Sequence, residues 1–121
     1  DFLHRVALFS AWRRQGQGKD ELVSAWSEAA MALLNEWGLE SQAMHMDWNK
    51  LSGGEAQRVY LAISVSTRPD VLLMDESTSA LDPDSKTRVE RSIERLAAEN
   101  GMVVLWITHD QEQVARLAKN V

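Results

Sequence analysis

Two short apolar runs stand out in the pattern of hydrophobic and polar positions along the chain. Val71–Met74 follows the breaker residues Pro69-Asp70, and Met102–Ile107 lies about thirty residues further on. A short uninterrupted apolar run between breakers is typical of a strand that is buried on both faces of a parallel sheet. The pattern therefore predicts two such strands, with Asp75 and Glu76 at the carboxyl end of the first.

The stretch between the two runs has the pattern of an amphipathic helix. Asp82 is a typical N-cap residue, Pro83 suits the first helical position, and Asn100-Gly101 supplies a terminator. The apolar positions of its inner side are Val89, Ile93, Leu96 and Ala97. The charged positions that we expect on a solvated outer face are Lys86, Arg88, Glu90, Arg91, Glu94 and Arg95. A helix that connects two strands in this way makes them parallel neighbours.

Helical patterns also precede this unit. Apolar residues of Glu21–Trp37 recur at three- and four-residue intervals, and Gly38 ends the pattern. Asp1–Arg14 has only a loosely helical spacing, and Leu39–Asn49 is irregular. A further helix is expected from Gly53 to Ser66.

A capping box opens the helix predicted from Gly53. Ser52 is followed three residues later by Glu55, and Gly53 and Gly54 lie between them. Glycines in a first helical turn are poor helix formers, yet their bare amides leave a helix N-terminus open to an anion. An ordinary helix cap with two incidental glycines explains this stretch equally well.

A Gly-Lys pair near the start of the chain raises the question of a phosphate-binding loop. The pattern G-x-x-x-x-G-K-[ST] requires a glycine where the chain has Arg13 and a serine or threonine where it has Asp20. No apolar strand precedes the pair Gly18-Lys19 either. We therefore interpret this stretch as a surface turn.

Charged side chains gather where the two predicted strands end. In a phosphate-handling site, Asp75 could hold Mg²⁺ and Glu76 could orient and polarise an attacking water. His109 follows the second strand, so it is expected in the same layer as the two carboxylates. The competing interpretation is a loop aspartate, a solvent-facing glutamate and a structural histidine. Thr108 and Gln111 can then cap a last helix, whose inner side would carry Val114, Leu117 and Ala118.

Composition narrows the function classes. A formal net charge of -5 argues against nucleic acid as a main partner, because such a surface needs a basic face. The absence of cysteine excludes disulfides and thiolate metal sites. No apolar run approaches the roughly 20 residues of a membrane helix. The first residue, Asp1, is not a methionine, which suggests a segment of something longer.

Four motifs together resemble the second half of an ATP-binding cassette ATPase. They are LSGGE (51–55), VLLMDE (71–76), SALD (79–82) and TH (108–109), in the order and spacing of that family. The resemblance implies an α/β fold, part of a P-loop NTPase domain, with parallel strands, a crossover helix and an N-terminal helical subdomain. It assigns residues 1–67 to the helical subdomain, which ends in the signature helix, and 68–121 to a partial RecA-like core.

The resemblance also implies roles for individual residues. Within the signature, Ser52, Gly53, Gly54 and Glu55 would bind nucleotide, with the serine and glycines touching the γ-phosphate of ATP on the opposing cassette. Asp75 resembles the Walker B ligand of Mg²⁺, and Glu76 the catalytic base. Asp82 resembles the D-loop aspartate, which would bind nucleotide and communicate across the dimer. His109 resembles the switch histidine and would be catalytic together with Glu76.

The implied function is ATP binding and hydrolysis in a transporter. Its partners would be a second ATPase cassette and transmembrane subunits, with the protein in the cytoplasm on the membrane's inner face. The Walker A loop, glutamine loop and adenine-stacking aromatic are absent from these 121 residues, so we expect the segment alone to be inactive. The alternative is a non-catalytic module that supplies only the signature motif to a partner ATPase.

Overall fold

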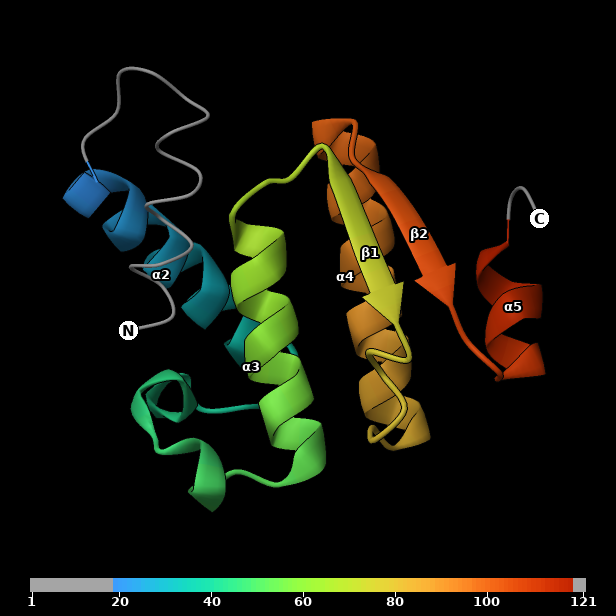
Figure 1. Cartoon of the computed structure of the whole chain (residues 1–121), viewed down its shortest axis with the longest axis horizontal. Coiled ribbons are helices and arrows are strands. Elements are labelled where there is room, and N and C mark those ends of the chain that lie inside the picture. The colour runs from blue at the N-terminus through green and yellow to red at the C-terminus, as the bar shows by residue number, and fades with distance from the viewer. Residues whose placement is uncertain (1–18, 119–121) are drawn as a thin grey trace.

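The computed structural model describes residues 19–118, in which helical segments come first and two strands then alternate with helices (Figure 1). The predicted helix over Asp1–Arg14 and most of the surface turn predicted for residues 15–20 lie outside the described residues. The prediction of a turn is wrong for Lys19 and Asp20, which begin helix α2. Within residues 19–118, no helix is long and apolar enough to cross a membrane. The elements are α2 (Lys19–Glu36), η1 (Ser41–His45), η2 (Trp48–Lys50), α3 (Gly53–Ser66), β1 (Val71–Asp75), α4 (Pro83–Asn100), β2 (Val103–Ile107) and α5 (Gln111–Leu117).

The two strands form a parallel pair, as predicted. Val71 pairs with Val103 at one end of the register and Asp75 with Ile107 at the other. Helix α4 connects them, and both arrows in Figure 1 point the same way. The carboxyl ends of β1 and β2 therefore lie side by side, which brings the residues that follow each strand to one edge of the sheet.

The prediction that the strands are buried on both faces is wrong for the described residues. Leu72 and Met74 are buried against the cluster that contains Val89 and Ile93 of α4. Their neighbours Val71 and Leu73 are each 61% exposed, so burial alternates along β1. Side chains of a strand alternate between faces, and among residues 19–118 only one face of this pair is covered.

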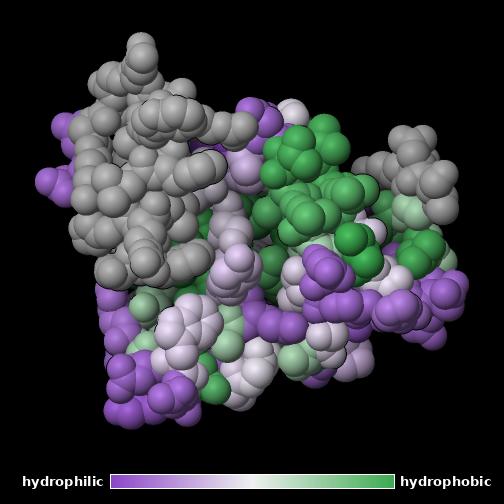
Figure 2. Space-filling model, viewed as in Figure 1, coloured by the Kyte–Doolittle hydropathy of each residue, from purple (hydrophilic) through white to green (hydrophobic). Residues whose placement is uncertain are grey.

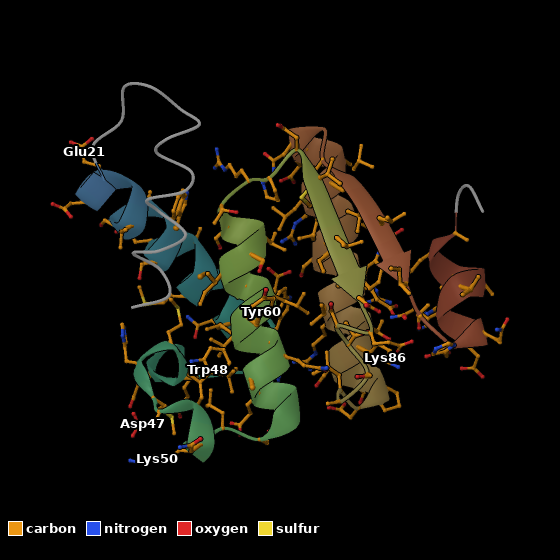
Figure 3. The ribbon with its side chains drawn as sticks, viewed as in Figure 1. Glu21, Asp47, Trp48, Lys50, Tyr60 and Lys86 are labelled. Atoms are coloured by element: carbon orange, nitrogen blue, oxygen red, sulfur yellow. The ribbon has the colours of Figure 1, made fainter. Side chains whose placement is uncertain are left out.

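The uncovered face forms an apolar patch, which we call the open sheet face. Figure 2 shows hydrophobic residues gathered over the strands. Tyr60 of α3, labelled in Figure 3, lines a groove with Val71 and Leu72 beside this face. A contiguous apolar patch of this kind marks a place where further structure packs. The exposed strand residues that form the open sheet face are Val71, Leu73, Val103, Leu105 and Ile107.

Helix α4 begins and ends as predicted, but its charged side is only partly solvated. The side chain of Asp82 accepts a hydrogen bond from Ser85 N, and Gly101 ends the helix in the left-handed conformation (φ 65°). The prediction of a wholly solvated outer face is wrong, because Glu90 is buried and Lys86 is half-buried. Lys86 pairs with Asp110 and Glu90 pairs with Arg116. Both partners lie on or next to α5, so the sequence of α4 alone could not predict this burial.

The N-terminal helices pack on α4 as part of one buried cluster. Ala30, Leu34 and Trp37 of α2 belong to the same cluster as Ile93 of α4. Trp37 Nε1 also donates a hydrogen bond of 2.9 Å to Ser92 Oγ. One buried cluster contains residues from both sides of residue 67. The division of the chain into a helical subdomain and a core at this residue stays a prediction. The segment predicted to be irregular contains two short 3₁₀ helices, and His45 is exposed there.

An ion pair between Glu36 and Arg95 adds to the contact between α2 and α4. Arg95 Nη1 donates to Oε1 at 2.9 Å and Nη2 to Oε2 at 3.0 Å. This paired hydrogen bond is the main reason why the pKa of Glu36 is lowered, with a smaller lowering contribution from Ser92. A carboxylate of lowered pKa stabilises the fold above its ordinary pKa, and the stabilisation is lost as the pH falls through the folded-state pKa.

Replacing Arg95 tests this linkage. We expect Arg95→Gln to lower the free energy of unfolding near neutral pH by up to about 1 kcal/mol, since both side chains are partly exposed. The difference from wild type should shrink as the pH falls below about 4.3, where glutamate begins to protonate. Urea unfolding at several pH values measures it, with Arg91→Gln on the exposed side of α4 as control. A difference that does not vary with pH would contradict the assignment.

Candidate functional site

The N-terminus of α3 has the predicted capping box. Glu55 N donates to Ser52 Oγ at 3.1 Å, and Ser52 N donates to Glu55 Oε1 at 3.0 Å. The hydrogen bond from the Ser52 backbone is the first cause of the lowered pKa of Glu55. Gly53 is exposed and Gly54 half-buried, so the first turn of the helix lies at the surface. The glycine amides are thus accessible to an anion.

Gly54 also allows α3 to approach the loop after β1. A Cβ built on Gly54 would lie 3.0 Å from the carbonyl oxygen of Ala80. At Gly53 the nearest contact would be ordinary, 3.6 Å from Ala80 Cβ. The two adjacent glycines therefore differ, because only at Gly54 would a Cβ make an unusually tight contact with a backbone atom.

Glu76 occupies an unusual backbone conformation directly after β1. Its φ is 50°, in the left-handed region that a residue with a Cβ rarely adopts. Glu76 N donates to Ile107 O at 2.9 Å, which continues the pairing of the two strands by one residue. Its carbonyl oxygen accepts from Ser79 N at 3.2 Å. The backbone of Glu76 is thus held from both sides at the strand end.

The side chain of Glu76 meets His109, as the sequence predicted. His109 N donates to Glu76 Oε1 at 2.9 Å, and His109 Nε2 lies 3.7 Å from the same oxygen. The imidazole is 97% exposed, whereas the Glu76 side chain is 38% exposed. Asp75 precedes them at the same sheet edge and is exposed. Within residues 19–118, no group of three His, Asp or Glu side chains could hold a metal by itself.

A side chain of α3 that sequence reasoning missed contacts this turn. Gln57 Oε1 accepts from Ala80 N at 2.9 Å. Its Nε2 donates to Ser79 Oγ at 3.2 Å and to Glu76 O at 3.4 Å. Gln57 lies three and four positions after the two glycines, which puts it on the same side of the helix. This spacing is the signal by which the sequence could have predicted that Gln57 lies beside the two glycines.

A buried polar network contacts the same turn from the other side. Gln113 Nε2 donates to Thr78 Oγ1 at 3.0 Å and to Glu90 Oε1 at 2.9 Å. Arg116 donates through Nε and Nη2 to both oxygens of Glu90, at 3.2 and 2.9 Å. Thr78, Glu90 and Gln113 are all buried, and such groups need these partners to offset their desolvation. The network therefore fixes the turn relative to α4 and α5.

The start of α5 differs from the prediction. Asp110, rather than the pair Thr108 and Gln111, caps the helix, and its side chain accepts from Glu112 N and Gln113 N. Lys86 Nζ, labelled in Figure 3, also donates to Asp110 Oδ2 at 2.9 Å and lowers the pKa of Asp110. Thr108 Oγ1 instead accepts from Asp110 N. Thr108 and Asp110 could both accept hydrogen bonds from the first amides of α5. Asp110 caps the helix because its carboxylate is charged and is also bound by the ammonium group of Lys86.

The inner side of α5 also differs. Val114 and Leu117 are half-buried and Ala118 is exposed, while the most buried residue of the helix is Gln113. The apolar pattern could not show this, because Gln113 is buried through its hydrogen bonds and not through hydrophobicity.

Comparison with known proteins identifies the family. The sequence model of the family described as ABC transporter matches residues 5–79, more than half of the chain. This chain belongs to the ABC transporter family. Its α/β arrangement, with a parallel strand pair, is consistent with the P-loop NTPase fold that membership implies.

Several curated relatives are ATP-binding subunits. The methionine import ATP-binding protein MetN of Cutibacterium acnes is 47% identical over 90 residues, which are 74% of this chain and 24% of that protein. MetN of Ligilactobacillus salivarius is 39% identical over 94 residues (78% of this chain, 26% of that protein). The glycine betaine/proline betaine transport system ATP-binding protein ProV of Escherichia coli is 38% identical over 94 residues (78% and 23%). This ABC chain therefore spans about a quarter of the length of these relatives.

The fold brings the predicted site residues of this ABC chain into two groups. Asp75, Glu76 and His109 share one edge of the sheet, while Ser52, Gly53, Gly54 and Glu55 form the start of α3. Gln57 and the Gly54–Ala80 contact connect the groups. Asp82 is engaged as the cap of α4, since its two oxygens accept from Ser85 N at 3.1 Å and Ser85 Oγ at 2.6 Å. Ser85 also lowers the pKa of Asp82.

The two glycines provide a matched test of the packing at the start of α3. We expect Gly53→Ala to leave the free energy of unfolding unchanged or to raise it by up to about 1 kcal/mol, through better helix propensity. Gly54→Ala should be the less stable of the two variants, because its methyl group would press on Ala80 O. Urea unfolding of both variants measures the difference. If Gly54→Ala were as stable as Gly53→Ala, the close approach of α3 to the loop would not constrain the residue.

Proposed function

We propose that this chain is the helical subdomain and second half of an ATPase cassette that couples ATP hydrolysis to transport across a membrane. Residues 1–67 would form the subdomain that ends in the signature helix, and 68–121 a partial RecA-like core. The observation that carries the proposal is that the carboxylate of Glu76 accepts from the backbone amide of His109 and lies 3.7 Å from its imidazole, although the two residues follow different strands. A module that served only a partner's nucleotide would have no use for this pair.

In the proposed reaction, Glu76 is the base that orients the attacking water. Its Oε1 accepts from His109 N, so Oε2 is left to accept a hydrogen bond from a water molecule. The exposed imidazole of His109 can donate to the γ-phosphate of ATP on the same cassette. The carboxylate is oriented by the main-chain amide of His109.

Asp75 is the proposed ligand of Mg²⁺. Magnesium in phosphate sites takes one or two carboxylates and fills its other positions with water and phosphate oxygens, so a single exposed aspartate at the strand end fits. When bound, the ion supplies positive charge that offsets the charge of the phosphates. Asp75 would hold it beside Glu76, at the edge where ligands of α/β sheets bind.

The signature turn is proposed to serve a second cassette. Ser52, Gly53 and Gly54 lie at the exposed start of α3, where amide groups and the helix dipole favour an anion. The carboxylate of Glu55 holds the turn in shape through Ser52 N. The anion would be the triphosphate of ATP on the opposing cassette, and Asp82 would lie near the interface of the two.

The open sheet face supports the view that the cassette continues beyond this chain. Val71, Leu73 and Leu105 are more than half exposed, which is unusual for strands of a parallel sheet. The part of the cassette that carries the Walker A loop would cover them. Transmembrane subunits would hold the complete protein at the cytoplasmic face of a membrane, and the formal charge of -5 gives no reason to expect nucleic acid as a partner.

Glu76→Gln in the complete cassette tests the proposed function. The amide keeps the shape of the side chain but cannot accept the proton of the attacking water, so hydrolysis should fall by about a hundredfold or more. Dimers that hold ATP should accumulate, as measured by size-exclusion chromatography with MgATP. Glu99→Gln at the exposed end of α4 is the control. Unchanged turnover in Glu76→Gln would support the non-catalytic module instead.

The isolated 121 residues should bind ATP only weakly. The missing Walker A amides and lysine would each supply a charged hydrogen bond that contributes roughly 1.5 to 3 kcal/mol. Without several of these, we expect no saturation in a calorimetric titration with MgATP up to millimolar concentration. Micromolar affinity would show that the chain binds nucleotide through residues outside the proposed site.

A further inference from the structure

We propose that Gln57 is a positioning residue for Glu76, holding the left-handed turn that aims the carboxylate at the edge of the sheet. The inference rests on the proposed function and adds a residue that belongs to none of the four motifs. Gln57 would also connect the two groups of site residues, since it lies on the helix that the signature turn opens.

The contacts of Gln57 define how its amide is oriented. Ala80 N can only donate, so the atom that faces it at 2.9 Å is the carbonyl oxygen of the side chain. The amide nitrogen is then directed at Ser79 Oγ and at Glu76 O, at 3.2 and 3.4 Å. Gln57 is half-buried, and its hydrogen bond to Glu76 O is the most buried of the three. One side chain thus bridges three residues of the turn.

Glu76 needs support of this kind. A left-handed backbone is disfavoured for a residue with a Cβ and persists where the surroundings determine it from several directions. On its amino side, Glu76 N is fixed by Ile107 O. On its carbonyl side, the contacts are Ser79 N, which belongs to the same turn, and Gln57 Nε2, which belongs to a different element. Gln57 is therefore the contact that anchors the carbonyl side of Glu76 to α3.

The consequence for the reaction follows from the direction of the side chain. If the backbone of Glu76 relaxes toward a more common conformation, its Cα–Cβ bond turns and the carboxylate leaves His109 N. The base would then lie in the wrong place while the signature turn remained intact. Small misplacements of a catalytic group can lower a rate by about a hundredfold. Loss of Gln57 should therefore lower kcat and leave nucleotide binding largely unchanged.

Two substitutions separate the contacts. Gln57→Glu keeps the size and the oxygen that accepts from Ala80 N, but it loses the donor to Glu76 O and puts a carboxylate oxygen against that carbonyl. Gln57→Leu removes donor and acceptor together. Ser64→Ala is the matched control on α3, because Ser64 Oγ donates only to Tyr60 O of its own helix among the hydrogen bonds described.

The experiment uses the complete cassette and measures ATP turnover, KM for ATP and accumulation of ATP-bound dimers. We expect both Gln57 variants to lose at least about tenfold in kcat, to keep KM within about twofold and to accumulate dimers. In the Glu76→Gln background, Gln57→Leu should cause no further loss, because its effect acts through the missing base. Ser64→Ala should match wild type.

Other outcomes overturn the inference in distinguishable ways. Wild-type turnover in both Gln57 variants, together with loss in Glu76→Gln, would overturn the role of Gln57 and leave the proposed function standing. Loss of dimer formation with the loss of kcat would mean that Gln57 holds the interface or the fold instead of Glu76. Full turnover in Glu76→Gln would overturn the proposed function and this inference with it.

Discussion

The structure depends on the left-handed backbone of Glu76, which ends β1 and redirects the chain along the edge of the sheet. That conformation is disfavoured for a glutamate, by about 1–2 kcal/mol, and is maintained by contacts from β2, from α3 and from the loop after β2. Ile107 of β2 accepts from its amide, Gln57 of α3 donates to its carbonyl oxygen, and the main-chain amide of His109, in the loop after β2, donates to its carboxylate. The parallel pairing of the strands is what brings these contacts to one place.

The turn that follows Glu76 is held by polar side chains of two helices, α3 and α5. On one side the amide of Gln57 bonds to Ala80, and on the other the buried pair Gln113 and Glu90 reaches Thr78. All buried side-chain polar atoms in residues 19–118 have hydrogen-bond partners, so the network has no unsatisfied group that would favour another arrangement. A rigid turn of this kind suits a site whose groups must be in place before the substrate arrives.

The open sheet face has a different physical meaning from the site. It is apolar, and its side chains project from a strand pair whose other face is already buried by α4. A two-stranded sheet with one covered face is marginal by itself, since strands of parallel sheets are normally covered on both sides. The chain spans about a quarter of the length of its relatives, and under the proposed function further parts of a cassette would cover this face.

The sequence determined the local structure: the capping box at Ser52, the Asp82-Pro83 start and Gly101 end of α4, and the parallel strands with Glu76 and His109 at adjacent ends. The caps and the ends of the elements depend on residues within a few positions of each other, and the parallel pairing follows from the helix that connects the two strands. Only the tertiary structure decided the burial of Glu90, the Lys86 partner of Asp110 and the contacts of Gln57, because the partners lie 19 or more residues away along the chain. The apolar run also could not predict that Val71 and Leu73 are exposed. A run of hydrophobic residues shows that a strand can be buried, but not whether other residues cover it.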